Sequence, residues 1–245
     1  MMDLPRTPGF RLDGKHALVA GGSSGIGLAS AVALAEAGAA VTLAARSAGK
    51  LDTIVAQMTR AGMTARALSL DVADIPATEA AIAANGPYDI LVNSAGLAIH
   101  SPALDTTEAD FDAVSDINVK GAYFLTRAVA RGLIDAGKPG SLINITSQMA
   151  LVGGIDRAVY CATKHAVEGF TKAMAIEWGK QGIRVNTIGP TFIRTPLTEQ
   201  TFANPDRVAW IMDKIKLGRL GEVTDIMGPV VYLASDASGL MTGSH

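Results

Sequence analysis

Short apolar segments alternate with longer helical segments along most of the chain, and this alternation constrains the fold more than any other feature. Alternation of strands and helices predicts right-handed crossovers and a parallel sheet. Strands that are apolar throughout predict helices on both faces of that sheet. We therefore expect an α/β fold, a single doubly wound domain over residues 1–245 with a parallel sheet of six or seven strands. The expected strands cover residues 16–20, 41–45, 65–70, 89–92, 141–146 and 183–188, and the expected helices 24–37, 51–61, 78–84, 109–136 and 159–180.

Charge and composition exclude several classes of protein. The formal net charge is −2 and no lysine or arginine cluster stands out, so we expect no nucleic-acid partner. The single cysteine, Cys161, allows no intrachain disulfide, which favours a reducing compartment. The N-terminus lacks the pattern of a secretory signal, and no apolar run approaches the ~20 residues that span a bilayer. We expect a cytoplasmic protein with no membrane association and no bound metal.

A glycine-rich segment, Gly21-Gly22-Ser23-Ser24-Gly25-Ile26-Gly27, lies between the first strand and the first helix. Glycines allow the backbone to turn tightly and to approach a diphosphate closely. The helix that follows offers free N–H groups and the positive end of its dipole to the anion. The segment therefore predicts a dinucleotide site, although such a loop alone is also compatible with a turn that only permits close packing.

Four polar residues form a candidate catalytic group. Tyr160 and Lys164 are four residues apart on a helix and share a face, so a lysine charge is expected to lower the pKa of the phenol. Ser147 follows an apolar strand, where its hydroxyl can hold a substrate carbonyl oxygen, and Asn118 lies between apolar neighbours in a long helix. Taken singly, each has a simpler interpretation: a surface pair, a turn serine, and an asparagine that faces solvent or bonds to an internal partner.

Together these motifs resemble the short-chain dehydrogenase/reductase family, whose fold is a Rossmann domain. The resemblance runs from Gly14 to Gly243 and rests on separated motifs in the right order. It implies that Asn118, Ser147, Tyr160 and Lys164 form the catalytic tetrad. Tyr160 would be the general acid/base, Ser147 would polarise the carbonyl, Lys164 would also hold the nicotinamide ribose, and Asn118 would anchor a relay water.

Further segments extend the resemblance across the chain. These are Leu70-Asp71-Val72 beside adenine, Asn93-Ser94-Ala95-Gly96 after the fourth strand, the nicotinamide loop from Gly189 to Thr195, Gly218-Arg219-Leu220-Gly221, and Leu233-Ala234-Ser235-Asp236. The residues expected to contact the cofactor are Gly21, Ser23, Ser24, Gly25, Ile26, Gly27, Arg46, Ser47, Asp71, Val72, Asn93, Ala95, Gly96, Tyr160, Lys164, Pro190, Ile193 and Thr195.

Three positions depart from the family pattern. Ala20 replaces a usual threonine, which removes a structural hydroxyl. Thr191 replaces a usual glycine after Pro190, which changes the nicotinamide-side loop. Family members continue from a segment like Thr242-Gly243 into a seventh strand, so we expect the natural chain to extend beyond His245.

The end of the second strand predicts the choice of cofactor. An acidic residue there would bind the ribose 2′-hydroxyl of NAD and repel a 2′-phosphate. This chain has Arg46 and Ser47 instead, and an arginine makes charge-assisted bonds to phosphate. We expect NADP(H) to be preferred over NAD(H). The alternative is that Arg46 stacks on adenine or faces solvent.

The substrate is less constrained by the sequence. We expect a pocket lined by His100, Gln148, Met149, Leu151, Gly153 and Gly154, with residues 196–216 as a mobile lid. Within the family the chain is most similar to the L-xylulose reductase group and to sugar and polyol dehydrogenases. That similarity favours hydride transfer between the nicotinamide and a small ketone or secondary alcohol, such as a ketose, a polyol or an α-dicarbonyl.

Two other functions fit parts of the pattern. One is a 3-oxoacyl carrier-protein reductase, which would need basic residues such as Arg127 and Arg131 to dock its acidic carrier. The other is a dinucleotide-sensing protein without turnover, although such a protein would not need all four tetrad residues. The family resemblance also implies a homo-oligomer, a dimer or a tetramer, that pairs through the long helices.

Overall fold

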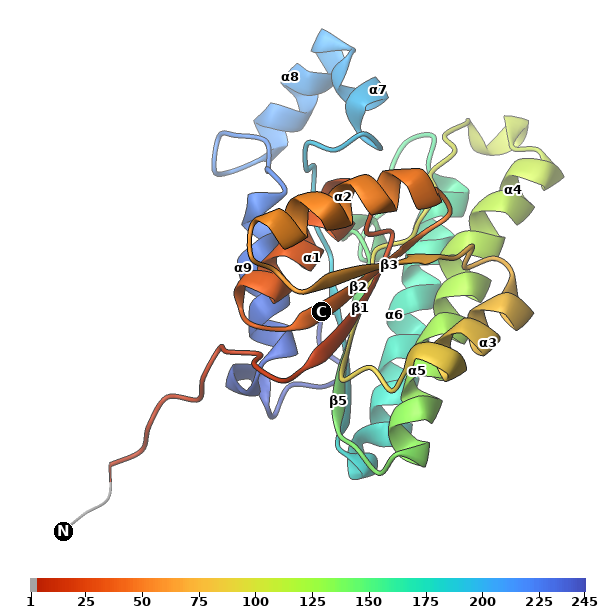
Figure 1. The fold of residues 1–245 in the computed structure, drawn as a ribbon. Coiled ribbons are helices and arrows are strands. Elements are labelled where there is room, and N and C mark those ends of the chain that lie inside the picture. Colours follow the sequence, from red (N-terminus) through yellow and green to blue (C-terminus); the bar gives the residue numbers. More distant parts are fainter. Residues whose placement is uncertain (1–3) are drawn as a thin grey trace.

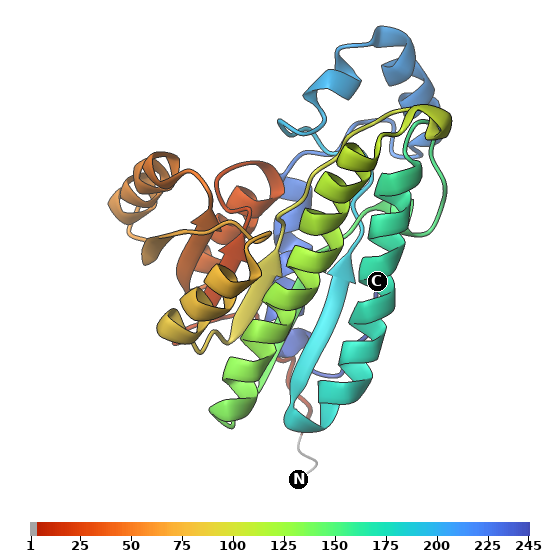
Figure 2. The same cartoon turned by 90° about the vertical axis from the view of Figure 1, so that its right-hand side faces the viewer.

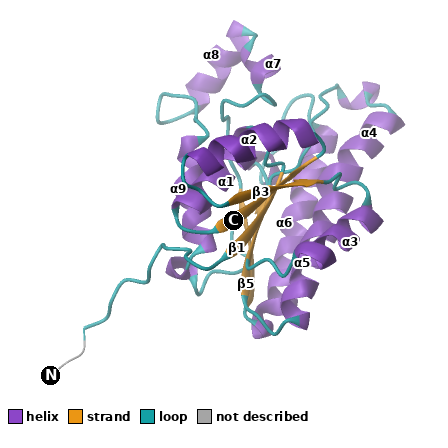
Figure 3. Ribbon diagram, viewed as in Figure 1, coloured by secondary structure: helices purple, strands orange, loops and turns teal. Residues whose placement is uncertain are grey.

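A computed structural model describes residues 4–245 as a six-stranded parallel sheet with helices on both faces (Figures 1 and 3). The strand order is β3-β2-β1-β4-β5-β6. The strands are β1 (His16–Ala20), β2 (Ala40–Ala45), β3 (Ala65–Ser69), β4 (Ile90–Asn93), β5 (Gly140–Ile145) and β6 (Ile183–Ile188). The order reverses between β1 and β4, and in doubly wound sheets the crevice at such a reversal binds the ligand.

Two layers of helices cover the sheet. Helices α1 (Gly25–Glu36), α2 (Ala48–Arg60) and α9 (Thr224–Ala234) share one apolar core with the sheet. Helices α3 (Ile75–Asn85), α5 (Ala122–Asp135) and α6 (Ala158–Trp178) share the core on the opposite face, where Figure 2 shows α5 and α6 lying along the strands. The remaining helices are α4 (Glu108–Ser115), α7 (Glu199–Phe202) and α8 (Pro205–Lys214).

The strands follow the predicted pattern closely, because all six expected segments form strands within two residues of the predicted bounds. Burial explains this success, since β1 and β4 have no exposed residue. Strand β3 is an exception. It lies at the sheet edge, and three of its five residues are exposed, so the expectation of continuous burial is wrong there.

The helices depart from prediction in three places, one of which is the expected lid at 196–216, where α7 and α8 form. The expected helix at 109–136 is divided into α4, a π-helical segment from Asp116 to Gly121, and α5. Helix α9 was not predicted, and Pro229 inside it obscures the helical pattern. No helix in residues 4–245 is both long and apolar enough to cross a membrane.

The last residues of the chain lie along the outer edge of β6. The Gly243 amide donates to the Val185 carbonyl at 2.7 Å, and the Thr187 amide donates to the Ser244 carbonyl at 2.9 Å. The side chains of Thr242 and His245 continue this contact, with hydrogen bonds to Val185 and Thr187. The C-terminal residues therefore cover the edge that β6 would otherwise expose.

Candidate active site

A cleft of about 520 Å³ opens at the carboxyl ends of the strands, where the strand order reverses. Most of the residues predicted to contact the cofactor line this cleft: Gly21, Ser23, Ser24, Gly25, Ile26, Arg46, Ser47, Asp71, Val72, Ala95, Gly96, Tyr160, Lys164, Pro190, Ile193 and Thr195. Ser147 lies in the same wall. The structure therefore brings together residues as far apart in sequence as Gly21 and Thr195, as expected for a site at the carboxyl ends of parallel strands.

The glycine loop is shaped by backbone contacts. Gly21 has a φ of +73°, and a Cβ placed on it would lie 2.7 Å from the Ser94 carbonyl carbon. A Cβ on Gly27 would collide with the Gly21 carbonyl oxygen, so Gly27 allows α1 to begin directly against the loop. The first turn of α1 has neither a side-chain cap nor an acidic residue. Its N–H groups are thus available to an anion at the cleft, which fits a dinucleotide diphosphate.

Positive charge gathers at the far end of the cleft. Arg46 and Ser47 follow β2 as predicted, and Lys50 on the first turn of α2 also lines the cleft. No acidic side chain lies between Ala44 and Lys50. Lys50 was missed because sequence reasoning considered only the strand end and the glycine loop. Two cations without an acid at this position suit a phosphate on the adenosine ribose.

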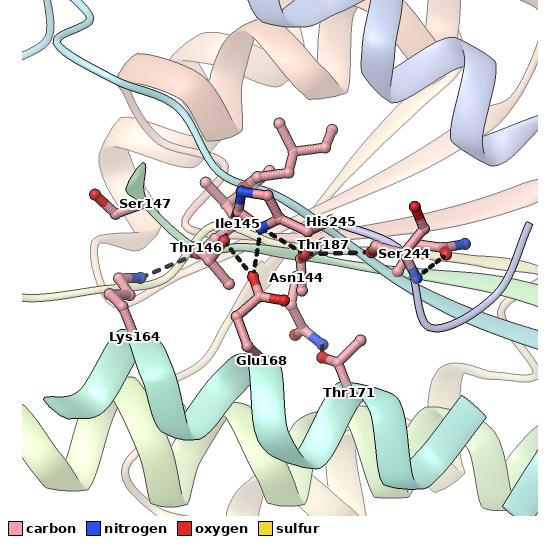
Figure 4. Close-up of polar contacts among 12 residues, drawn as sticks. Asn144, Ile145, Thr146, Ser147, Lys164, Glu168, Thr171, Thr187, Ser244 and His245 are labelled. Carbon is pink, nitrogen blue, oxygen red and sulfur yellow. Dashed lines mark hydrogen bonds and ion pairs between the residues drawn. The ribbon is translucent and has the colours of Figure 1, made fainter. Parts of the chain in front are cut away.

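Lys164 is buried beneath the cleft, with a side chain that reaches the end of β5. Its Nζ donates to the Ile145 carbonyl at 3.0 Å and lies 5.6 Å from the centre of the Tyr160 ring. Burial lowers the pKa of Lys164 from 10.5 to about 8. In Figure 4, which draws the polar contacts around the end of β5, Lys164 and Ser147 lie on the same side of the residues drawn. The structure thus brings the predicted tyrosine, lysine and serine to one wall of the cleft.

Tyr160 has a pKa that differs from the sequence-based expectation. Burial raises the pKa of Tyr160 above its ordinary value, while the Ser147 hydroxyl and the Arg157 guanidinium oppose the rise. The prediction that the phenol pKa would be lowered by Lys164 is therefore wrong for this structure. The cation that acts most clearly on the phenol is Arg157, one helical turn earlier, which sequence reasoning overlooked.

Asn118 is buried within the π-helical segment and has protein partners. Its side-chain amide donates to the Leu97 carbonyl at 2.8 Å and to Thr163 Oγ1 at 3.2 Å, and its Oδ1 accepts from the Leu97 amide at 2.8 Å. A Cβ on Gly96 would lie 3.5 Å from Asn118 Oδ1 and 3.8 Å from Lys164 Nζ. Asn118 therefore fixes the loop after β4 against the helix that carries Lys164.

Ser147 directly follows the buried end of β5. Its Oγ accepts a hydrogen bond from the Met149 amide at 3.1 Å, which leaves its hydroxyl proton available to another acceptor. The preceding residue, Thr146, donates at 2.9 Å to the buried carboxylate of Glu168, which is also 2.7 Å from His245 Nδ1 (Figure 4). Glu168 was not predicted, and it ties the end of β5 to α6.

The loop from Gly189 to Thr195, predicted to hold the nicotinamide, lies against the glycine loop. A Cβ on Gly25 would lie 3.3 Å from the Thr195 side chain. The backbone N–H of Gln148 donates to the Pro190 carbonyl at 3.0 Å. The hydroxyl of Thr191, at the position where the family usually has glycine, hydrogen-bonds to Gln148 Oε1. This departure from the family pattern thus links the nicotinamide loop to the predicted substrate pocket.

Three predicted residues lie behind the cleft instead of in its lining. Gly27 packs beneath the glycine loop, and Asn118 lies behind Gly96. Asn93 is buried, accepts from the Ala95 amide at 3.3 Å and donates to Asn144 Oδ1 at 3.3 Å. All three shape the backbone that forms the wall.

In the described part of the chain, the lining of the cleft includes none of the predicted substrate residues His100, Gln148, Met149, Leu151, Gly153 and Gly154. His100 nevertheless lies beside the cleft, because its ring meets the Tyr160 ring edge-on, with centroids 6.1 Å apart. Met149 is buried, whereas Leu151 is 60% exposed. The predicted lid at 196–216 contains α7 and α8, and Leu197 and Thr198 at its start line the cleft.

Comparison with known proteins agrees with this geometry. A family model described as enoyl-(acyl carrier protein) reductase matches residues 20–245. The chain is 39% identical to D-erythrulose reductase of Gallus gallus over 237 residues, which cover 97% of this chain and 95% of the relative. It is 38% identical to L-xylulose reductase of Bos taurus, covering 96% and 95% of the two chains.

A third relative and a solved structure are named for derivatives of gluconate. The chain is 39% identical to 2-dehydro-3-deoxy-D-gluconate 5-dehydrogenase of Dickeya dadantii, covering 96% of this chain and 93% of the relative. A crystal structure described as a putative 2-deoxy-D-gluconate 3-dehydrogenase from Agrobacterium tumefaciens, with bound NADP, superposes with a TM-score of 0.92 at 40% identity. That match covers 98% of this chain and 96% of the other.

The chain therefore belongs to the short-chain dehydrogenase/reductase family, and it is an oxidoreductase that acts on CH–OH groups.

Proposed function

We propose that the protein transfers a hydride between NADP(H) and a small ketone or secondary alcohol, such as a ketose, a polyol or an α-dicarbonyl, with Tyr160 as general acid/base. The observation that carries the proposal is the meeting of Tyr160, Ser147 and Lys164 in one wall of a cleft whose other end is the glycine loop. The relatives named for erythrulose, xylulose and a deoxygluconate support a sugar-like substrate.

The residues present fit a dinucleotide. The uncapped first turn of α1 would hold the diphosphate, and Gly21 lets the backbone come close to it. Lys164 and the loop from Pro190 to Thr195 would hold the nicotinamide half. When bound, the nicotinamide supplies or accepts the hydride.

The chain's own residues manage the proton. Burial keeps the Tyr160 phenol protonated at neutral pH, as a proton donor to a carbonyl must be. Ser147 Oγ accepts from the Met149 amide, so its hydroxyl can donate its proton to the substrate oxygen beside the phenol. As the proton leaves, the Arg157 guanidinium and the Ser147 hydroxyl stabilise the phenolate. Asn118 acts as a positioning residue, because its side chain is engaged by Leu97 and Thr163.

We further propose that NADP(H) is preferred over NAD(H). Arg46, Ser47 and Lys50 lie where a 2′-phosphate would sit, and no carboxylate there would repel it. The related Agrobacterium tumefaciens structure contains NADP, which supports the use of this cofactor.

The working form of the protein is also a proposal. We expect residues 1–245 to act as one dinucleotide-binding and catalytic domain, in a cytoplasmic homodimer or homotetramer. Exposed apolar side chains on α4, α5 and α6, namely Phe111, Tyr123 and Ile176, support pairing through these helices. Size-exclusion chromatography with light scattering tests the assembly.

A carrier-protein substrate has less support. Arg127, one of the two arginines considered for docking an acidic carrier, is already paired with Glu79 and stacks on Phe124 at 4.4 Å. Arg131 alone does not make a basic docking surface.

The proposal is tested by titrating the protein with NADPH and with NADH, then following oxidation of each with diacetyl, L-xylulose and small ketones. We expect tighter binding of NADPH and turnover of at least one carbonyl substrate. NADH binding more tightly would contradict the cofactor assignment. Tight cofactor binding without turnover in either direction, polyol and sugar-acid oxidation included, would favour the dinucleotide-sensing alternative.

A further inference from the structure

Three basic residues lie near one another beside the Tyr160 end of the cleft. Arg157 ends the loop before α6, His100 lies on the loop after β4, and Arg207 belongs to α8. His100 meets the Tyr160 ring edge-on at 6.1 Å, and the Arg157 guanidinium carbon lies 5.9 Å from the centre of the Phe192 ring. His100, Arg157 and Arg207 thus come together from three segments that are far apart in sequence, with His100 in contact with the Tyr160 ring.

Arg157 differs from the other partly buried arginines. Arg127 pairs with Glu79, Arg184 donates to the Leu233 carbonyl at 2.6 Å, and Arg207 lies 3.5 Å from Asp156. Among the side chains that the structure describes, none is a hydrogen-bond or ion-pair partner of Arg157. The Arg157 guanidinium is only partly buried and has no oxygen partner among these side chains, so its N–H groups are open to an oxygen supplied by a ligand.

The surroundings of Arg157 hold more positive than negative charge. Asp156 is the nearby acid, and Arg207 already neutralises it. The backbone of Asp156 is fixed by the Ser101 amide, which donates to its carbonyl at 3.2 Å. Burial, reinforced by Arg157 and Arg207, lowers the pKa of His100 to about 4, so His100 is neutral at physiological pH and adds a hydrogen-bonding group without charge.

The chemistry of these groups discriminates between substrates. A carboxylate offers two oxygens that match the fork of a guanidinium, and a charge that compensates its burial. The hydroxyls of a neutral polyol offer neither. A substrate that reaches from Tyr160 to Arg157 is therefore bound more tightly when it carries a carboxylate.

We propose that Arg157 determines specificity by binding a carboxylate of the substrate, so that the preferred substrates are sugar acids with a secondary hydroxyl or a ketone. Arg207 contributes a second, weaker charge from α8. This inference rests on the proposed function, since it assumes that Tyr160 marks the reacting carbon. It narrows the substrate class from ketoses and polyols in general to those that also carry a carboxylate.

The test compares matched acid and neutral substrates in NADP⁺-dependent oxidation. D-Gluconate is paired with D-glucitol, and L-threonate with L-threitol, and kcat/KM is measured for each with the wild-type protein, Arg157→Met and Arg157→Lys. We expect the wild type to prefer the acid in at least one pair. Arg157→Met should lower kcat/KM for that acid by roughly 10- to 100-fold, and Arg157→Lys should restore part of it.

The ratio of acid to neutral kcat/KM separates recognition from other roles of Arg157. If Arg157 only lowered the pKa of Tyr160 or held the loop, Arg157→Met would slow both members of a pair equally and leave the ratio unchanged. Arg131→Met, an exposed arginine on α5, is the matched control and should leave both values unchanged. Higher salt should raise KM for the acid and not for the polyol.

Different results would overturn the carboxylate specificity of Arg157 and the proposed hydride-transfer function. Turnover of polyols as fast as acids, or a ratio that Arg157→Met does not change, overturns the carboxylate inference and leaves the proposed function intact. Absence of turnover with every pair and with diacetyl, L-xylulose and small ketones, despite NADPH binding, overturns the proposed function together with the inference.

Discussion

The two sides of the cleft differ in whether backbone or side-chain atoms form them. The cofactor side consists of strand ends and backbone: β1, the glycine loop and the start of α1 are positioned by buried strands and by contacts such as that between Gly21 and Ser94. The proposed substrate side consists of side chains from loops and from α8, including the partly exposed His100 and Arg207. A backbone site permits one ligand shape, whereas a side-chain site can change its ligand by single substitutions.

The largest effect is expected in the wall that both sides share. Ser147→Ala removes the hydroxyl that would hold the substrate oxygen, and we expect kcat to fall by about 10²–10⁴-fold. NADPH binding, measured by fluorescence titration, should stay within twofold of the wild type, because Ser147 is proposed to contact the substrate oxygen. A change in kcat of less than tenfold would contradict the role given to Ser147.

A pair of glycine variants compares the two sides directly. Gly21→Ala places a side chain 2.7 Å from the Ser94 backbone at a φ of +73°, so we expect the free energy of unfolding to fall by about 3 kcal/mol and NADPH binding to be lost. Gly153→Ala, on the substrate side, meets nothing within 4 Å and should change stability by less than about 0.5 kcal/mol. Equal losses in the free energy of unfolding of the two variants, measured by urea titration, would contradict the difference proposed between the two sides of the cleft.

Lys164 makes folding stability depend on pH. Its folded pKa of about 8 lies below its ordinary 10.5, so the unfolded chain binds more protons between these values. The stability contributed by this group is therefore present above pH 10.5 and is lost as pH falls towards 8, by about 3 kcal/mol in total. Urea unfolding across this range should show that slope in the wild type and not in Lys164→Met, which should also be inactive.

A smaller effect is expected at the ribose end of the cleft. Arg46→Ala should weaken NADPH binding by about tenfold and change NADH binding by less than twofold, because only NADPH carries the 2′-phosphate. Lys50→Ala should act in the same direction. Arg60→Ala, at the other end of α2, serves as the control. Equal losses for both cofactors would show that Arg46 stacks on adenine.

The smallest effect is expected at His100. Its pKa in the folded protein, about 4, lies below its ordinary 6.5, so the stability it contributes is lost as pH falls from 6.5 to 4. Because His100 is also partly exposed to solvent, the loss should be well below that for Lys164. His100→Gln should make unfolding less sensitive to pH in this window, as measured by thermal melts at matched ionic strength.

The difference between backbone-formed and side-chain-formed parts of the cleft also explains which site residues could be predicted from the sequence. Strand ends, the glycine loop and the order of motifs follow from periodicity and backbone geometry, so the positions of Tyr160, Lys164 and Ser147 were predicted. Arg157 and Glu168 were missed because their roles depend on which loops and helices meet in three dimensions. The pKa of Tyr160 was predicted in the wrong direction because burial is not visible in a spacing of four residues.

The central claim is that Tyr160 transfers the proton that accompanies hydride transfer. Its most direct test is a single-turnover measurement of NADPH oxidation, by absorbance in a stopped-flow instrument, with wild type and Tyr160→Phe saturated with cofactor and the best carbonyl substrate. We predict that Tyr160→Phe binds NADPH with unchanged affinity and oxidises it at least 100-fold more slowly. Oxidation by Tyr160→Phe at a rate near that of the wild type would contradict the mechanism.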